Sequence, residues 1–161
     1  MRASGILMPV FSLPSRYGIG SFSKSAYQFV DMLKKAGQKY WQILPLCPTS
    51  YGDSPYQSFS TYAGNPYFID LDQLIEEKLL TRKECQACDF GDDPQDIDYG
   101  KLYENRFKLL RKAYERANVG EDQEFEAYRR ENAWWLDDYA LFMAVKDRFD
   151  GVAWNEWAED I

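Results

Sequence analysis

The sequence predicts an α/β start followed by an all-helical block. Two short apolar runs, residues 4–13 and 40–46, are each typical of a buried strand. The segment between them carries apolar residues at helical spacing. Because a strand, a helix and a second strand follow one another, we expect the two strands to pair in parallel. Beyond residue 69 only helical patterns remain.

The first strand is expected to end or become irregular at Pro9, because proline cannot donate to a strand ladder. Ser21 or Ser23 can cap the helix that follows, and Gly37 is placed to end it. The apolar positions of this helix are Ala26, Phe29, Val30, Leu33 and Ala36.

Two short helices are predicted after the second strand. Asp70 or Asp72 can cap the first of them. Thr81 and Glu84 form a capping-box pattern for the second. The apolar residues expected on the first are Leu74, Ile75 and Leu79.

Two longer helices complete the pattern. Asp98 is expected to start one of them, and the other is expected to run from about Glu121 to Phe149, with Gly151 beyond its end. The predicted apolar stripe of the first is Tyr103, Phe107, Leu110, Tyr114 and Ala117. That of the second is Trp135, Tyr139, Phe142, Val145 and Phe149. The end of the chain, with Trp154 and Trp157, is typical of a new helix carrying two exposed tryptophans.

Residues 50–66 form the most informative segment. They combine aromatic rings, small hydroxyls, a carboxylate and four Gly or Pro residues, directly after the second apolar run. Such a composition at a strand end is typical of a binding loop. Aromatic faces pack on sugar rings while polar groups bond sugar hydroxyls, so a carbohydrate site is the first hypothesis. On composition alone, a turn cluster whose rings cap the core stays equally open.

Size and charge limit the classes of partner. The chain has 161 residues and a net charge of −7, with 17% aromatic residues, which fits one domain with a hydrophobic core. Residues 1–69 carry six Lys or Arg and two Asp or Glu, so the acidic excess lies in the remainder. Phosphate binding needs clustered positive charge, so we expect no nucleic-acid partner. The sequence has no apolar segment long enough to cross a membrane, so we expect no membrane partner.

Cysteine and histidine usage limits the chemistry. Cys47, Cys85 and Cys88, without a secretory signal, favour a reduced, cytoplasmic setting. Cys85 and Cys88 have the spacing of a metal or redox pair, but zinc needs about four ligands and the chain has no second Cys pair and no histidine. We therefore expect no metal and no cofactor. Without histidine, His-based triads are also excluded.

Several long motifs follow one another along the chain. They are SGIL (4–7), SLPSRYGIG (12–20), WQILPLCPT (41–49), GDSPYQSFS (52–60), AGNP (63–66), WLDDYALF (135–142) and the Trp pair at 154 and 157. Together they closely resemble the N-terminal portion of the amylomaltases, the bacterial 4-α-glucanotransferases of glycoside hydrolase family 77, in the α-amylase clan.

The resemblance implies a fold. Residues 1–69 would be the start of a catalytic (β/α)8 TIM barrel, contributing its first two strands and first helix, and residues 70–161 an all-helical inserted subdomain. The rest of the barrel would lie outside this chain, as the missing C-terminal part of the same protein. A barrel of this kind needs about 250 residues, so we infer a fragment.

The resemblance also implies an activity in carbohydrate metabolism. Family members transfer α-1,4-glucan segments between maltooligosaccharides by a retaining double displacement, with an aspartate nucleophile, a glutamate acid/base, a second aspartate and no cofactor. Those three carboxylates lie beyond this chain in the family's order, so no catalytic residue is expected here and the 161 residues alone are expected to be inactive. We expect the acidic pairs Asp92–Asp93 and Asp137–Asp138 to be solvated residues at helix ends and on helix faces, not catalytic pairs.

Three residues of the loop after the second strand are implied substrate contacts. Tyr56 matches the family tyrosine that stacks on the sugar at the cleavage site, and Pro55 before it restricts the backbone. Ser54 matches a polar residue that can bond a sugar hydroxyl. For Asp53, sugar contact and support of the turn are equally open.

A second glucan groove is implied by two tyrosines. Tyr51 matches its aromatic residue in the family. Tyr99 is the candidate for the tyrosine that joins it, with Tyr103 one helical turn away as the alternative. Asn65 and Pro66 match the family but are expected to be structural.

Two other classes of protein stay open. One is a non-catalytic carbohydrate-binding or helical interaction module, which chain beyond Ile161 in the reading frame would exclude. The other is an α-amylase-type hydrolase, which would release glucose or maltose rather than transfer products.

Overall fold

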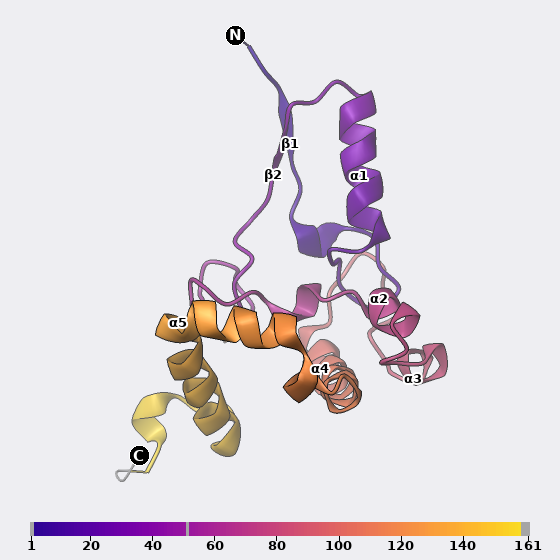
Figure 1. Cartoon of the computed structure of the whole chain (residues 1–161). Helices are drawn as coiled ribbons and strands as arrows, with labels where there is room; N and C mark the ends of the chain where they lie inside the picture. Colours follow the sequence, from indigo (N-terminus) through magenta and orange to yellow (C-terminus); the bar gives the residue numbers. More distant parts are fainter. Residues whose placement is uncertain (1, 51, 159–161) are drawn as a thin grey trace. The chain divides into compact units, whose positions relative to one another are not determined.

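The computed structural model describes residues 2–50 and 52–158. The chain divides into two compact units, Met1–Asn118 and Val119–Ile161. The first unit contains a strand pair with one helix and a group of three further helices, and the second is built on one long helix (Figure 1). All regular elements described after residue 69 are helical, as predicted.

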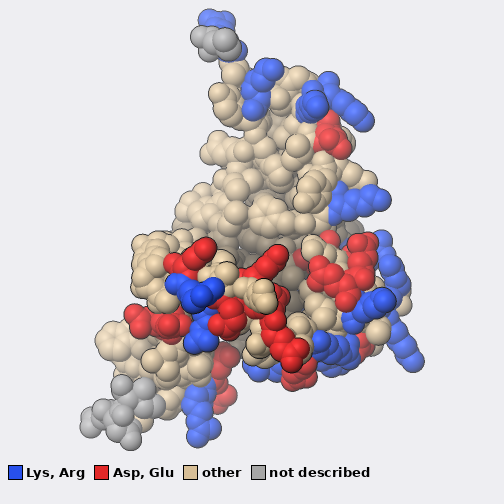
Figure 2. Space-filling model, in the orientation of Figure 1, with Lys and Arg blue, Asp and Glu red and all other residues tan. Residues whose placement is uncertain are grey.

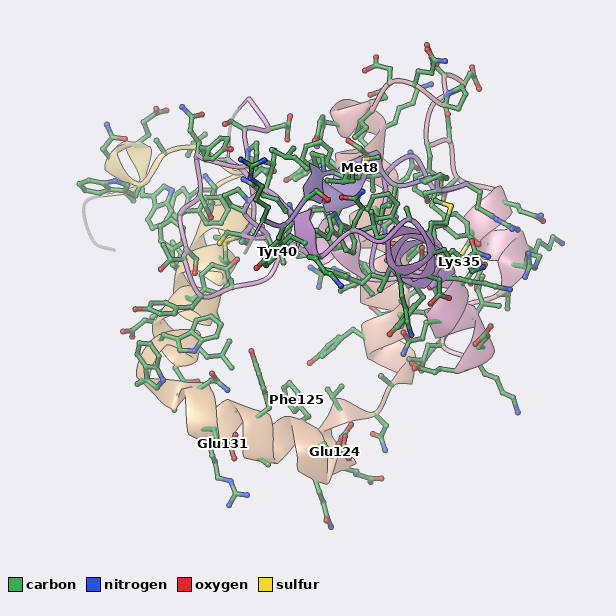
Figure 3. All side chains as sticks on the ribbon, turned by 90° about the horizontal axis from the view of Figure 1, so that it is seen from above. Met8, Lys35, Tyr40, Glu124, Phe125 and Glu131 are labelled. Atoms are coloured by element: carbon green, nitrogen blue, oxygen red, sulfur yellow. The ribbon has the colours of Figure 1, made fainter. Side chains whose placement is uncertain are left out.

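Strands β1 (Gly5–Leu7) and β2 (Tyr40–Gln42) pair in parallel, with Gly5 opposite Tyr40. Two backbone bonds extend the ladder beyond the strands, from Lys39 N to Ser4 O at 2.9 Å and from Met8 N to Gln42 O at 3.0 Å. Helix α1 (Lys24–Lys35) joins the strands and lies beside them (Figure 1). Figure 3 looks along α1, with Lys35 at its C-terminal end. The predicted strand–helix–strand order and parallel pairing are confirmed.

The prediction of buried strands over residues 4–13 and 40–46 is wrong in extent and in burial. Each strand has three residues, and Tyr40 is 66% exposed. After Pro9 the chain turns into a 3-10 helix, η1 (Val10–Ser12), which agrees with the irregularity predicted there. An apolar run marks residues that favour burial, but burial needs neighbouring strands and helices, and the described sheet has only two strands.

The contacts of α1 hold the strand pair. Ser23 caps the helix by accepting a bond from Ser25 N, and Gly37, with φ +71°, follows its end. Phe29 packs edge-on against Trp41 with ring centroids 5.1 Å apart. The Trp41 indole donates to Met8 O at 2.7 Å. One aromatic pair and one hydrogen bond therefore tie α1, β2 and the end of β1 together.

The caps predicted for the next three helices are confirmed. Helix α2 (Leu71–Glu76) is capped by Asp70, α3 (Arg82–Gln86) by the Thr81 and Glu84 capping box, and α4 (Tyr99–Arg116) by Asp98. Another 3-10 helix, η2 (Pro66–Phe68), precedes α2. Leu79, predicted within the first short helix, lies beyond the end of α2.

The apolar stripe predicted for α4 is largely on its exposed side. Tyr103 and Tyr114 are each 61% exposed, and Phe107 is also exposed. Four other residues of α4 form its buried face: Leu102, Arg106, Leu109 and Ala113. They share the same spacing of four, three and four residues, but an arginine interrupts them, so the aromatic stripe gave the stronger sequence signal.

The core of the first unit lies between η1, the turn before α1 and helices α2 to α4. Its least exposed apolar side chains are Val10, Ile19, Leu71, Leu80, Cys85, Leu102 and Leu109. The strand pair therefore lies at the edge of this core.

The second unit consists of a short 3-10 helix, η3 (Val119–Glu121), then α5 (Gln123–Arg148), capped by Asp122, and η4 (Trp154–Glu156). The predicted face of α5 is its less exposed one, since all five predicted residues are partly buried. The predicted new helix with two exposed tryptophans is a single 3-10 turn. Trp154 is exposed, whereas Trp157 stacks on Phe149 with ring centroids 5.9 Å apart, and its indole donates to Val152 O at 3.3 Å.

Charge is distributed as the sequence indicates. On the face drawn in Figure 2, the charged side chains around β1, β2 and α1 are mainly Lys and Arg, whereas most of the acidic side chains lie on the later helices, together with further Lys and Arg. In the described part of the chain, no helix is both long and apolar enough to cross a membrane.

Candidate functional site

The segment after β2 is a closed loop whose two ends are bonded together. Asn65 N donates to Leu46 O at 2.8 Å, which joins the ends across almost twenty residues. A second bond, from Ser50 N to Gln57 O at 3.0 Å, closes a smaller turn at the tip. Compact loops closed in this way present their side chains from a defined backbone.

The tip turn depends on two residues with positive φ, Gly52 at +88° and Asp53 at +54°. Aspartate is one of the few side chains that tolerate this region. Thr49 Oγ1 donates to Asp53 Oδ1 at 3.5 Å, and Asp53 N donates to Ser50 O at 3.0 Å. The structure thus shows Asp53 supporting the turn, which was one of its two predicted roles.

The two loop residues after Asp53 differ in accessibility. Tyr56 is 72% exposed, so its ring is available to a ligand. Ser54 is half-buried, and its hydroxyl accepts a bond from Tyr56 N at 3.3 Å. This local bond orients the backbone of Tyr56. Tyr51, the predicted second-groove residue, lies outside the described residues.

A small hollow lies beneath the tip turn. It has room for about one water molecule, at about 10 Å³, so a sugar ring does not fit inside it. Its polar lining comes from Thr49, Asp53, Asn65 and Tyr99. The apolar and thiol lining residues are Phe11, Ile19, Pro45, Cys47, Pro55 and Phe68. The hollow therefore joins the loop to the start of α4, and Tyr56 is outside its lining.

The charge of Asp53 affects the pKa of two tyrosines, Tyr67 and Tyr99. Burial raises the pKa of the Asp53 carboxyl, and the Thr49 hydrogen bond opposes that shift. Burial, followed by the charge of Asp53, raises the pKa of Tyr67 to about 12 and also raises the pKa of Tyr99. Both phenols therefore stay protonated and able to donate near neutral pH.

Tyr99 belongs to an aromatic cluster with Tyr67, Phe107 and Tyr103. Its ring lies 6.3 Å from that of Tyr67, which in turn lies 5.6 Å from Phe107. The exposed ring of Tyr103 is 5.6 Å from Phe107 and extends the cluster outward. Tyr67 was not predicted from the sequence. Its position directly after Asn65 and Pro66 was a signal of a turn there, and in the structure Asn65 caps η2 and accepts a bond from Tyr67 N at 2.9 Å.

The structure brings together some of the predicted site residues. Asp53 and Tyr99 line the same hollow, and Ser54 and Tyr56 lie next to it on the loop. Tyr103 is on the outer side of the aromatic cluster. Asn65 acts structurally, as predicted, by closing the loop and capping η2.

The described residues contain no group of three or more His, Cys, Asp or Glu placed to hold a metal ion. Burial raises the pKa of the Cys85 thiol, and the neighbouring Cys88 adds to that shift. The acidic pairs Asp92–Asp93 and Asp137–Asp138 are exposed, as predicted. What the described site offers is a platform of rings, hydroxyls and one carboxylate, suited to binding and orienting a polyhydroxylated ligand.

Comparison with known proteins gives one consistent result. The sequence profile of the glycoside hydrolase 77 family, described as 4-alpha-glucanotransferase, matches residues 8–161. A 4-alpha-glucanotransferase of Clostridium butyricum is 54% identical over 96% of this chain and 32% of its own length. One from Thermus thermophilus is 47% identical over 97% of this chain and 31% of its own.

The fold comparison agrees with the sequence comparison. The structure of an amylomaltase from Streptococcus agalactiae in complex with acarbose is similar to this chain, with a TM-score of 0.91 and 44% identity. The match covers 99% of this chain and 32% of that protein. The chain thus spans about a third of the length of the relatives it matches.

Proposed function

This chain belongs to the 4-alpha-glucanotransferase family, whose profile spans residues 8–161, and we propose that it is the N-terminal third of a 4-α-glucanotransferase. In this proposal the whole protein transfers α-1,4-glucan segments between maltooligosaccharides. The observation that carries the proposal is the match over nearly the full chain to enzymes of that name at 47 to 54% identity.

For the fold, we propose that β1, α1 and β2 are the first elements of a (β/α)8 barrel and that residues 70–161 are a helical insertion. The parallel pair with a helix between its strands supports this assignment. So does the exposure of the strands, because further strands would cover them.

For the site, we propose that Tyr56 stacks on a sugar ring, that Ser54 bonds a sugar hydroxyl and that Asp53 holds the turn and faces the ligand. The loop follows β2, on the side where barrel enzymes place their sites. Tyr51 and Tyr99 are assigned to a second groove for longer chains. The acarbose bound to the Streptococcus agalactiae amylomaltase supports a carbohydrate ligand.

In the proposed chemistry, this chain binds and orients the glucan while carboxylates beyond Ile161 perform a retaining double displacement. The mechanism uses no metal or organic cofactor. We also propose a cytoplasmic setting, which the three free cysteines support because a reducing compartment maintains free thiols.

The decisive experiment follows products made from maltotriose by the product of the complete reading frame. Transfer predicts glucose together with maltooligosaccharides longer than maltotriose, and hydrolysis predicts only shorter sugars. Replacement Tyr56→Ala is expected to lower kcat/KM at least about tenfold, about 1.4 kcal/mol, because the stacking surface is lost. Replacement Tyr56→Phe is expected to retain most of the activity, since the ring remains.

Tyr114→Ala is the matched control, because Tyr114 is also an exposed tyrosine and lies near the far end of α4. Its kcat/KM is expected to stay within twofold of the wild type. Equal losses of kcat/KM in Tyr56→Ala and Tyr114→Ala would contradict the stacking role of Tyr56. Wild-type products that are never longer than maltotriose would contradict the transferase assignment.

A further inference from the structure

The side chain of Arg106 is buried in the first unit and has unusual partners. It lies on the core face of α4 and is 1% exposed. Its guanidinium donates to two backbone carbonyls, Ile69 O at 2.5 Å and Tyr17 O at 3.4 Å. Among the described residues, Arg106 Nε has no hydrogen-bond partner. The hydrogen bonds of this buried cation therefore go to backbone carbonyls.

Such burial is unfavourable. Removing a charged guanidinium from water costs free energy that two carbonyl bonds offset only in part. Burial correspondingly lowers the pKa of Arg106 to about 10, and the group stays charged near neutral pH. Leu102, Leu109 and Ala113 surround it on the same helix face, so an apolar residue suits this position better for stability alone. The positions of the two carbonyls that Arg106 binds, Tyr17 O and Ile69 O, indicate a role other than stability.

One of these carbonyls lies at the root of the binding loop. Ile69 ends η2, the segment that carries Asn65, Tyr67 and Phe68 to the hollow and the aromatic cluster. Asn65 and Phe68 line the hollow directly. The bond from Arg106 therefore holds the downstream end of the loop against α4.

The other carbonyl holds a second wall of the hollow. Tyr17 lies in the turn between Phe11 and Ile19, both of which line the hollow. The Tyr17 hydroxyl also donates to Asp72 Oδ1 at 2.7 Å, which connects this turn to α2. Arg106 thus joins two backbone segments that are separated in the sequence, one at Tyr17 and one at Ile69.

Helix α4 supplies the third wall through Tyr99, seven residues before Arg106 and on the same face of the helix. We propose that Arg106 is a positioning residue for the sugar-binding loop. It fixes the spacing between the loop that carries Asp53 and Tyr56 and the helix that carries Tyr99. This inference rests on the proposed carbohydrate function of that loop.

The test compares Arg106→Met with Arg116→Met in the product of the complete reading frame. Arg116 is also on α4 and also donates to a backbone carbonyl, Leu79 O at 3.0 Å, but its partners do not line the hollow. For Arg106→Met we expect KM for maltotriose and Kd for acarbose to rise about five- to tenfold, with kcat within about twofold. For Arg116→Met both constants are expected to stay within twofold. Arg106→Lys, which retains a donor, is expected to recover part of the loss.

Amide hydrogen exchange gives a readout that does not depend on activity. Peptides covering residues 50–57 and 65–69 are expected to exchange faster in Arg106→Met than in Arg116→Met. Unchanged KM, Kd and exchange in Arg106→Met would overturn the positioning role. If Arg106→Met does not fold, the same comparison is made with Arg106→Lys, whose single ammonium nitrogen replaces the two nitrogens that bond Tyr17 O and Ile69 O. A partial loss is expected there, and constants and exchange equal to those of the wild type would overturn the need for both bonds and with it the role. A wild-type protein that neither elongates maltotriose nor binds acarbose would instead refute the proposed function, and the exchange data would still decide whether Arg106 orders the loop.

Discussion

Gly20 illustrates how a single residue sets the path of the chain in the first unit. Its amide donates to Phe11 O at 2.9 Å, which folds the turn before α1 back onto η1. A Cβ at this position would lie 2.2 Å from Val10 O and 2.7 Å from Leu13 N. Both neighbours are backbone atoms in the core, so the position has no room for a side chain.

We expect Gly20→Ala to lower the free energy of unfolding by about 2 to 3 kcal/mol, because the added methyl group forces the backbone apart. Urea denaturation of the product of the complete reading frame measures this change. Gly64→Ala is the control, since a Cβ there meets nothing within 4 Å, and its effect is expected to be below about 0.5 kcal/mol. Equal effects of the two substitutions would contradict the proposed steric cause.

The sequence predicted individual site residues unevenly. The composition of residues 50–66 indicated a binding loop, whereas Tyr56 and Ser54 were singled out within it by the resemblance to the amylomaltases, and their contacts with a sugar stay predictions. Arg106 was missed because an arginine in a helix has no local pattern that indicates burial. Tyr67 was missed because the Asn65–Pro66 step before it indicates a turn and does not indicate which ring is buried. Their roles come from contacts with residues distant in the chain, Tyr99 and Ile69.

At the scale of elements, α3 and α4 are held together by one glutamate. Glu84 completes the capping box of α3 and accepts two bonds from Arg116 of α4, at 2.8 and 3.0 Å. The Arg116 hydrogen bonds, followed by the bonds from Thr81, lower the pKa of Glu84 to about 2. This exposed ion pair therefore links a capped helix end to the neighbouring helix.

The lowered pKa predicts how stability depends on pH. The ordinary pKa of about 4.5 is higher than the folded value of about 2, so the contribution of Glu84 is fully present above about pH 4.5. It is lost as the pH falls toward 2. In thermal unfolding, the difference in Tm between wild type and Glu84→Gln should therefore shrink over this range. Glutamine still fits a capping box, so the comparison isolates the charge.

Arg116→Met provides the matched variant, because it removes the hydrogen-bonded cation of Glu84 and retains the carboxylate, with Lys112 still 3.8 Å away. We expect its Tm deficit to shrink over the same pH range, and the double variant to show little coupling at pH 2. A difference in Tm that stays constant between pH 7 and pH 2 would show that the pair does not contribute through its charge.

Helix ends were predicted better than helix faces. The caps at Ser23, Asp70, Thr81 and Asp98 are confirmed because capping depends on residues close in sequence. The buried face of α4 was predicted wrongly, since two adjacent stripes have the same spacing. The two stripes are distinguished only by tertiary packing, because Leu102, Leu109 and Ala113 belong to the core cluster that also contains Val10, Ile19 and Leu71.

At the scale of the whole molecule, this chain is two compact units with an incompletely covered strand pair. An isolated two-stranded sheet is marginally stable at best in water. The predicted partition into residues 1–69 and 70–161 refers to domains of a longer protein and stays a prediction.

We expect the 161-residue chain alone to show no disproportionation of maltotriose, because the proposed catalytic carboxylates are outside it. Chromatography of the products, with the product of the complete reading frame assayed in parallel, tests this expectation. Glucose and maltooligosaccharides longer than maltotriose formed by the short chain would contradict it and would place a catalytic pair among the carboxylates of this segment.

The sequence by itself determined the order of elements, the parallel pairing, the helix caps and the identity of the family, because each depends on local pattern or on motifs in a fixed order. The tertiary structure alone decided which face of α4 is buried, how short and exposed the strands are, and how the loop is held. Those properties depend on contacts between distant segments, such as the bonds from Arg106 to Tyr17 and Ile69. Burial is a property of the assembled chain, and no single segment specifies it.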